Sequence, residues 1–80
     1  MSKIEKLLAK FKAPTGQFKW SEMIALLAHL WFQKVEGKGS RVVFINGAVI
    51  IKLHKPHPQK KVKAYVVKQV KEILEREGLL

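Results

Sequence analysis

This chain of 80 residues contains no cysteine and no aspartate. Because cysteine is absent, disulfide bonds, zinc–thiolate sites and thiol nucleophiles are excluded. The six acidic residues are glutamates, and no group of them has the carboxylate density that a two-metal nuclease requires. The sequence also lacks a P-loop and a dinucleotide-binding glycine motif. We therefore predict that the protein holds no metal and no cofactor.

Long hydrophobic runs are absent as well. The longest mostly apolar stretch, from Met23 to Phe32, contains His29 and is too short to span a bilayer. Lysines and Glu5 interrupt the N-terminal segment, which lacks the apolar centre of a signal peptide. We expect a soluble, cytoplasmic protein with one domain over residues 1–80, comprising an N-terminal helix and linker (1–18) and a core (19–80).

Basic residues are abundant, in contrast. The chain has 16 lysines and arginines against 6 acidic residues, a formal net charge of +10. Such a charge favours a polyanionic partner, through electrostatic attraction and counterion release. Nucleic acid, and RNA in particular, is the partner we expect first. A merely solvated basic surface and an acidic protein partner are the alternatives.

Apolar spacing predicts the order of the elements. Ser2 and Ser21 are placed to cap two helices, the first ending near Phe11 and the second near Trp31. Strands are expected over 32–36, 41–45 and 48–53, and a last helix over 60–77 with Val62, Tyr65, Val66, Gln69, Val70, Ile73 and Leu74 on its buried stripe. The fold class is therefore α+β, a three-stranded antiparallel sheet with helices packed on one face.

The dipeptide Asn46-Gly47 is a strong signal for a tight hairpin. A two-residue turn at these positions places Arg41 opposite Lys52, with His54 diagonal to Arg41. One sheet face is then core: Val42, Phe44, Val49, Ile51 and Leu53. The opposite face carries Arg41, Val43, Ile45, Ala48, Ile50, Lys52 and His54. We expect Trp20, Trp31 and Tyr65 to pack in the core rather than to stack on bases.

Two histidines stand beside turn-forming prolines. His54 and His57 lie in the segment Leu53-His54-Lys55-Pro56-His57-Pro58, and the prolines restrict the backbone around His57. Histidine titrates near neutral pH and can act as acid or base in cleaving RNA. A metal site at His54 and His57 would lack a convincing third ligand, and packing against the last helix is the other alternative. The third histidine, His29, is expected to be structural.

These motifs, taken together, resemble the HicA family of toxins from type II toxin–antitoxin systems. The resemblance rests on Trp20-Ser21-Glu22, Gly39-Ser40-Arg41-Val42-Val43-Phe44, Leu53 to Pro58, and Lys63 to Val70 with Leu74 and Gly78. It implies a fold like a double-stranded RNA-binding domain, metal-independent mRNA cleavage, and neutralisation by a HicB-type antitoxin. Many members read Gly-Ser-His where this chain has Arg41, and that histidine is taken as catalytic in the family.

Because Arg41 stands at that position, we expect His57, as the first choice, and His54 to transfer the protons. Which of the two is the base and which is the acid stays open. Arg41 and Lys52 are expected to stabilise phosphate charge. The other predicted RNA-binding residues are Lys55, Lys60, Lys61 and Lys63. The alternatives are a non-catalytic double-stranded RNA-binding module, in which the histidines are incidental, and a purely structural interaction protein.

The open sheet face offers an apolar patch of Val43, Ile45 and Ile50. Such a patch beside a charged rim is typical of a protein-binding surface. We expect an acidic antitoxin to cover it, with the toxin monomeric when free. The alternative is that the N-terminal segment, residues 2–18, folds across the sheet and buries the patch.

Overall fold

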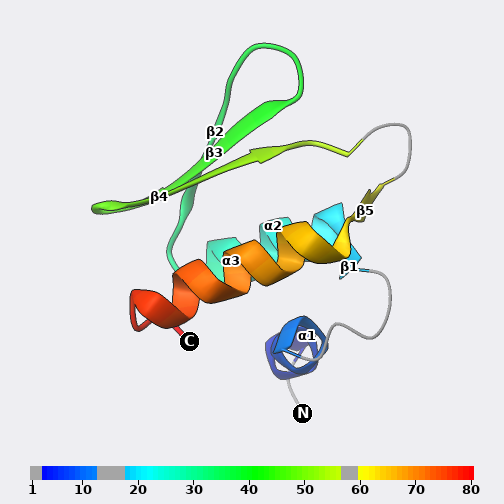
Figure 1. Cartoon of the computed structure of the whole chain (residues 1–80), viewed down its shortest axis with the longest axis vertical. Coiled ribbons are helices and arrows are strands. Elements are labelled where there is room, and N and C mark those ends of the chain that lie inside the picture. The colour runs from blue at the N-terminus through cyan, green and yellow to red at the C-terminus, as the bar shows by residue number, and fades with distance from the viewer. Residues whose placement is uncertain (1–2, 13–17, 57–59) are drawn as a thin grey trace.

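The computed structural model describes residues 3–12, 18–56 and 60–80 (Figure 1). Its elements are α1 (Lys3–Lys12), β1 (Phe18–Lys19), α2 (Trp20–His29), β2 (Gln33–Glu36), β3 (Arg41–Asn46), β4 (Val49–His54), β5 (Lys61–Val62) and α3 (Ala64–Arg76). The predicted α+β class is confirmed. The Ser2 cap predicted for the first helix lies outside the described residues.

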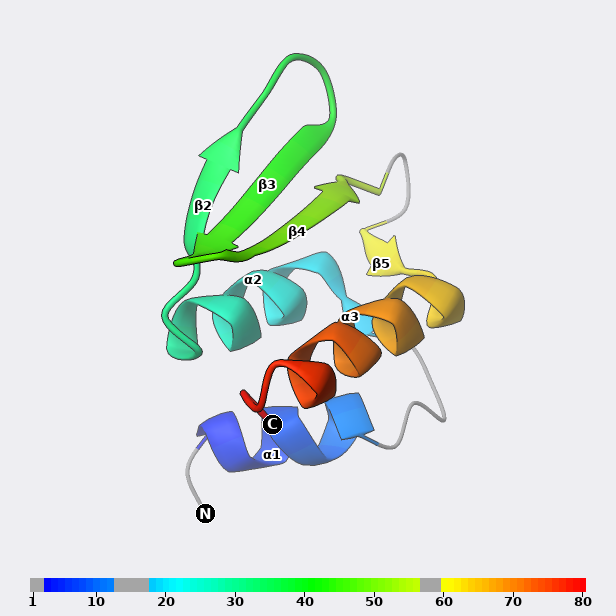
Figure 2. The same cartoon turned by 60° about the vertical axis from the view of Figure 1, so that its left-hand side comes forward.

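Strands β2, β3 and β4 form an antiparallel sheet in that order. Helices α2 and α3 lie side by side against one face of this sheet, and α1 lies on the far side of the two helices (Figure 2). The order α2-β2-β3-β4-α3 is the α-β-β-β-α arrangement of a double-stranded RNA-binding domain. Helix α1 is an addition to that arrangement.

The hydrophobic core fills the space between the sheet and the helices. The sheet contributes buried side chains from the face predicted to be core: Val42, Phe44, Ile51 and Leu53. They join a cluster with Trp20, Met23, Leu26 and Leu27 of α2 and Val67, Val70 and Leu74 of α3. The rings of Trp20 and Phe44 meet edge to face, with centroids 6.2 Å apart. This burial is what orients the opposite sheet face toward solvent.

The β3–β4 hairpin turns one residue later than predicted. Asn46 pairs with Val49, so Gly47 and Ala48 form the two-residue loop. Gly47 takes a positive φ of 58°, as the first central residue of a type II′ turn does, and the Asn46 side-chain amide donates to the Leu30 carbonyl oxygen at 3.0 Å. The pairing moves by two residues, which leaves every side chain on its predicted face.

The new register changes the pairs at the charged end of the hairpin. Arg41 lies opposite His54, and Lys52 lies opposite Val43. The predicted opposition of Arg41 and Lys52 is therefore wrong. Two like charges do not face each other there, and no destabilisation from such a pair arises.

Helix α2 begins at Trp20, and its N-cap is Lys19 rather than the predicted Ser21. Lys19 belongs to the short strand β1 and has the extended backbone of an N-cap, with φ −76° and ψ 150°. The Glu22 carboxylate accepts a hydrogen bond from the Lys19 backbone N–H at 2.9 Å. Ser21 therefore lies inside the first helical turn, where it is exposed.

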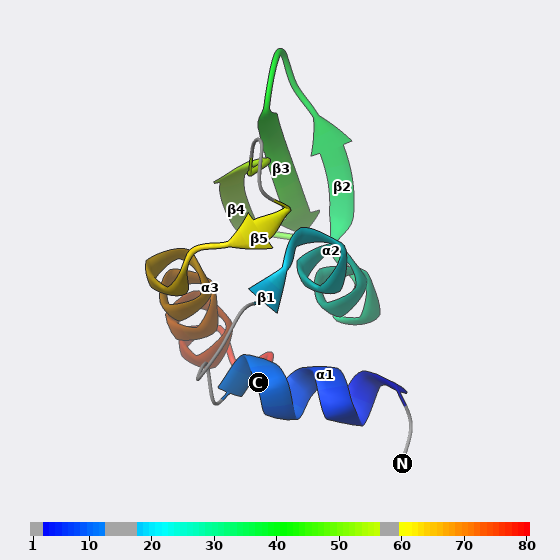
Figure 3. The same cartoon turned by 90° about the vertical axis from the view of Figure 1, so that its right-hand side faces the viewer.

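Strands β1 and β5 form a second, two-stranded antiparallel sheet that local sequence patterns did not predict (Figure 3). Phe18 pairs with Val62 and Lys19 with Lys61, and the Trp20 N–H donates to the Lys60 carbonyl oxygen at 3.0 Å. This pairing holds residues 60–63 extended. Helix α3 therefore starts at Ala64, four residues later than predicted.

Two of the three aromatic side chains predicted to be core are exposed. Trp20 is buried, but Trp31 is 85% exposed and Tyr65 is 61% exposed. In α3 Val67 lies on the buried face, and Tyr65 and Gln69 face solvent. The predicted stripe was therefore right for Val70 and Leu74 and wrong for Tyr65 and Gln69.

Helix α1 packs beneath the other helices instead of covering the sheet. Phe11 is fully buried and its ring lies 5.5 Å from that of Phe18. The Lys10 ammonium bonds both Glu22 carboxylate oxygens, at 2.8 and 3.1 Å, and the Lys71 ammonium donates to the Lys12 carbonyl oxygen. In the part of the chain that the structure describes, the alternative in which residues 2–18 cover the sheet is therefore wrong.

None of the helices in the described ranges is long and apolar enough to cross a membrane.

Candidate functional site

A groove of about 420 Å³ is lined by residues from the end of β4, from β5 and from the start of α3. Figure 2 shows how these three elements are arranged. The apolar lining of the groove includes Leu53 and Val62, both nearly buried, and Val66, half-buried. Its polar and aromatic lining consists of Lys52, His54, Lys55, Lys61, Lys63, Tyr65 and Gln69. The groove thus has an apolar floor and a basic rim that carries one described histidine.

The Gly39-Ser40-Arg41 motif and the start of the histidine segment, Leu53-His54-Lys55, are neighbours in space. Arg41 is directly opposite His54, and the Lys55 backbone N–H donates to the Ser40 carbonyl oxygen at 2.7 Å. Directly opposed residues of an antiparallel pair have Cβ atoms about 5 Å apart. A guanidinium and an imidazole therefore start from adjacent backbone positions on the outer sheet face, with Lys52 on the same face.

Most cations at the groove are unpaired. Among the described residues, no ion pair involves Lys52, Lys61 or Lys63. Lys55 is the exception, since its ammonium lies 4.0 Å from the Glu36 carboxylate. Lys60 is exposed but does not line the groove. Unpaired ammonium groups on one rim attract a polyanion.

The start of α3 adds to this positive field. Its N-cap, Lys63, makes no side-chain hydrogen bond to the first turn, and that turn contains no acidic residue. The first N–H groups of a helix have no partner within the helix and carry partial positive charge. Beside the lysines of the rim, they favour binding of a phosphate.

Among the histidines that the structure describes, His54 lines the groove and His29 does not. His57, the first choice for proton transfer, lies outside the described residues. His29 is exposed at the end of α2, which points away from the end of β4 that carries His54 (Figure 2). Within the described ranges, no three side chains among His, Cys, Asp and Glu are grouped to hold a metal ion.

Tyr65 and Gln69 line the groove, although the sequence pattern predicted both to be buried. Tyr65 is 61% exposed and lines the groove together with His54 and Lys63. In the structure Val67 rather than Tyr65 lies on the buried face of α3, which leaves the Tyr65 side chain at the groove.

The outer sheet face carries the predicted apolar patch. Val43 and Ile45 are half-buried and Ile50 is 53% exposed. Val35 of β2 pairs with Val43, so it lies on the same face, and it is 43% exposed. No described element covers these four residues, which we call the outer patch (Figure 1).

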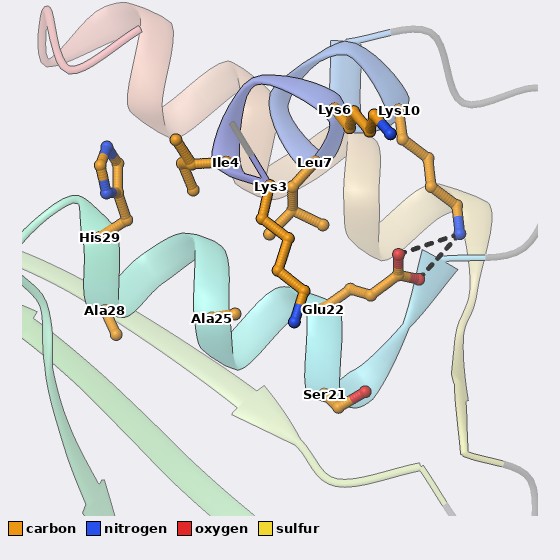
Figure 4. A pocket seen from close by; sticks show the side chains of 10 residues that line it. All are labelled: Lys3, Ile4, Lys6, Leu7, Lys10, Ser21, Glu22, Ala25, Ala28 and His29. Carbon is orange, nitrogen blue, oxygen red and sulfur yellow. Dashed lines mark hydrogen bonds and ion pairs between the residues drawn. The ribbon is translucent and has the colours of Figure 1, made fainter. Parts of the chain in front are cut away.

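A second hollow, of about 680 Å³, lies between α1 and α2 (Figure 4). Ile4, Leu7 and Ala25 line it, with His29 at one end and the Lys10–Glu22 ion pair at the other. Partial burial raises the pKa of Glu22, but the Lys10 ammonium and the Lys19 N–H outweigh it and hold that pKa below its ordinary value. This ion pair fastens α1 to α2.

Comparison with known families identifies the chain. The family model described as the HicA toxin of bacterial toxin–antitoxin systems matches residues 20–78. No curated protein and no solved structure matches. The matched region runs from the first residue of α2 to just beyond α3, so it includes the sheet, the groove and the outer patch but not α1. The chain therefore belongs to the HicA toxin family of bacterial toxin–antitoxin systems.

Proposed function

We propose that this protein is a metal-independent endoribonuclease that cleaves mRNA at the groove beside β4, and that a HicB-type antitoxin neutralises it. The observation that carries the proposal is the pairing of Arg41 with His54, which lines a groove together with four lysines. Membership of a toxin family supports a nuclease over a passive binding module.

The chemistry needs one base, one acid and positive charge. The base accepts the proton of a ribose 2′-hydroxyl, whose oxygen attacks the adjacent phosphorus. The bond from phosphorus to the 5′-oxygen breaks, and the acid donates a proton to that leaving oxygen. The products are a 2′,3′-cyclic phosphate and a 5′-hydroxyl. His57 and His54 supply the base and the acid in an order that the proposal leaves open.

Positive groups stabilise the charge that develops on the phosphoryl oxygens. Arg41 stands beside His54 and is the nearest such group by strand register, with Lys52 on the same face. Lys55, Lys61 and Lys63 bind neighbouring phosphates along the groove, and Lys60 extends this basic track outside it. These roles require no metal ion.

The antitoxin contacts the outer patch. Exposed β-branched side chains beside a cationic edge fit a partner whose surface is apolar at its centre and acidic at its rim. Because Arg41, Lys52 and His54 lie on the same sheet face as Val43, Ile45 and Ile50, a protein bound there also blocks RNA from reaching His54. Neutralisation by occlusion needs no change in the toxin fold.

Incubation of the purified protein with a mixed-sequence single-stranded RNA in EDTA tests the activity. We expect fragments from the unaltered protein and none from His57→Ala or His54→Ala. Tight RNA binding without fragments would instead establish the non-catalytic module, for which the double-stranded RNA-binding arrangement provides a precedent in fold. Equal cleavage by both histidine variants and the unaltered protein would remove the mechanism.

The salt dependence of RNA binding tests the site. On a log–log plot, affinity for a single strand falls by about 0.7 per phosphate contacted. Lys61→Ala combined with Lys63→Ala should reduce this slope by about 1.4. Lys3→Ala combined with Lys6→Ala removes the same charge from α1, on the far side of the molecule, and should leave the slope unchanged (Figure 2). Equal effects of the two pairs would place the RNA elsewhere.

A further inference from the structure

Tyr65 is an exposed aromatic residue at the groove. It lies in the first turn of α3, where Val66 is half-buried and Val67 is buried, so the helix is anchored without it. Its ring contributes no core packing, since 61% of the residue is exposed. An exposed ring that lines a groove is available to a ligand.

The surroundings of the ring restrict the kind of ligand. The groove holds about 420 Å³, within the range of small-molecule sites, and its floor is apolar. Lys61 and Lys63 lie four and two residues before Tyr65 in the chain. They line the same groove and make no ion pair among the described residues. An aromatic face with flanking cations matches a nucleobase attached to phosphates.

We infer that Tyr65 stacks on an unpaired nucleobase of the RNA and so positions the neighbouring phosphate at His54. This inference rests on the proposed function and specifies its substrate as single-stranded. A base inside a duplex is stacked on both faces and is not available to a protein ring. Proteins that bind duplex RNA read shape through phosphates and 2′-hydroxyls, and they need no such ring.

Tyr65 is therefore a positioning residue, and the proton transfers remain with the histidines. The stacked face of the ring does the binding, so the phenolic hydroxyl is dispensable. Tyr65→Phe should retain binding of single-stranded RNA, and Tyr65→Ala should weaken it. Base stacking is tolerant of sequence, so the loss should extend to RNAs of different sequence.

Binding of a 2′-O-methyl RNA decamer of mixed sequence, which cannot be cleaved, tests this role by fluorescence anisotropy. Tyr65→Ala should weaken binding of the single strand about tenfold, with an unchanged salt slope. Tyr65→Phe should bind within about twofold of the unaltered protein. The decamer annealed to its complement should bind Tyr65→Ala and the unaltered protein equally. Trp31→Ala removes the other strongly exposed ring, away from the groove, and should change neither affinity.

Two results overturn the inference. One is that Tyr65→Ala binds the single strand as the unaltered protein does; the other is that it loses single strand and duplex equally. If Lys61→Ala with Lys63→Ala still reduces the salt slope in either case, the proposed RNA site stands and only the stacking role is wrong. If the lysine variant has no effect either, the proposed site itself is wrong.

Discussion

Arg41 and His54 are directly opposed in the β3–β4 ladder, and this pairing follows from a hairpin that turns at Gly47-Ala48. It joins the Gly39-Ser40-Arg41 motif to the histidine segment in space. Arg41 therefore places a permanent cation beside an imidazole. Because an arginine does not exchange protons near neutral pH, charge stabilisation is the role that we propose for it.

Replacement of Arg41 by alanine should slow RNA cleavage about tenfold, equivalent to ~1.4 kcal/mol of transition-state stabilisation. The effect should be smaller than that of losing either catalytic histidine, because a base or an acid is essential and one of several cations is not. Single-turnover cleavage of a labelled RNA measures it. Arg76 is the only other arginine in the chain and lies at the end of α3, so Arg76→Ala is the matched control and should cleave normally.

Neighbouring isoleucines of β4 test the outer patch. Ile51 is 2% exposed and Ile50 is 53% exposed, so Ile51→Ala should cost about 2–4 kcal/mol of unfolding free energy and Ile50→Ala less than about 1.

Ile50→Glu should fold normally, cleave RNA, and bind the antitoxin at least tenfold more weakly, as calorimetry can measure. Ala9→Glu adds the same charge at an exposed position of α1 and should leave antitoxin binding unchanged. Unfolding of Ile50→Glu would show that the patch is packed.

The exposed ring of Trp31 comes with backbone strain. Trp31 has a positive φ of 68° just after α2. Its N–H donates to the Ala28 carbonyl oxygen, and the Phe32 N–H donates to the Leu27 carbonyl oxygen. These two hydrogen bonds form a Schellman motif. Glycine is the usual residue there, because a positive φ costs other residues about 1–2 kcal/mol. Trp31→Gly should therefore stabilise the fold by about 0.5 kcal/mol after the loss of backbone entropy in glycine.

Thermal unfolding followed by circular dichroism measures this gain as a rise in Tm of about 2–4 °C. Trp31→Ala removes the same ring but keeps the strain, and it should show no such rise. Equal Tm values for the glycine and alanine variants would mean that the positive φ is not strained.

The Lys10–Glu22 ion pair predicts a pH dependence. The folded protein holds the pKa of Glu22 below its ordinary value of 4.5. The ionised carboxylate therefore stabilises the fold at pH values above 4.5. This stabilisation is lost as the pH falls through the lowered pKa of the folded state. Both side chains are partly exposed, so we expect about 0.5–1 kcal/mol. Chemical denaturation should show Glu22→Gln less stable than the unaltered protein at pH 7, with the difference shrinking below pH 4.5. A difference independent of pH would contradict the ion pair.

Alternation along β3 and β4 was sufficient to predict the core face, because a register error of two residues keeps every side chain on its side. The same error gave Arg41 the wrong partner. The predicted two-residue loop began at Asn46, whereas the observed loop begins at Gly47. The start of α3 was not predictable locally. It depends on pairing between Lys61–Val62 and Phe18–Lys19, which are far apart in the chain.

In the proposed reaction, histidines transfer protons while the RNA's own 2′-hydroxyl attacks the phosphorus. Mass spectrometry of the fragments formed in EDTA identifies the attacking group. A 2′,3′-cyclic phosphate on the upstream product and a 5′-hydroxyl on the downstream product are expected, with no cleavage where a 2′-deoxy sugar precedes the scissile phosphate. A 5′-phosphate on the downstream product, or cleavage that requires added divalent metal, would contradict this mechanism.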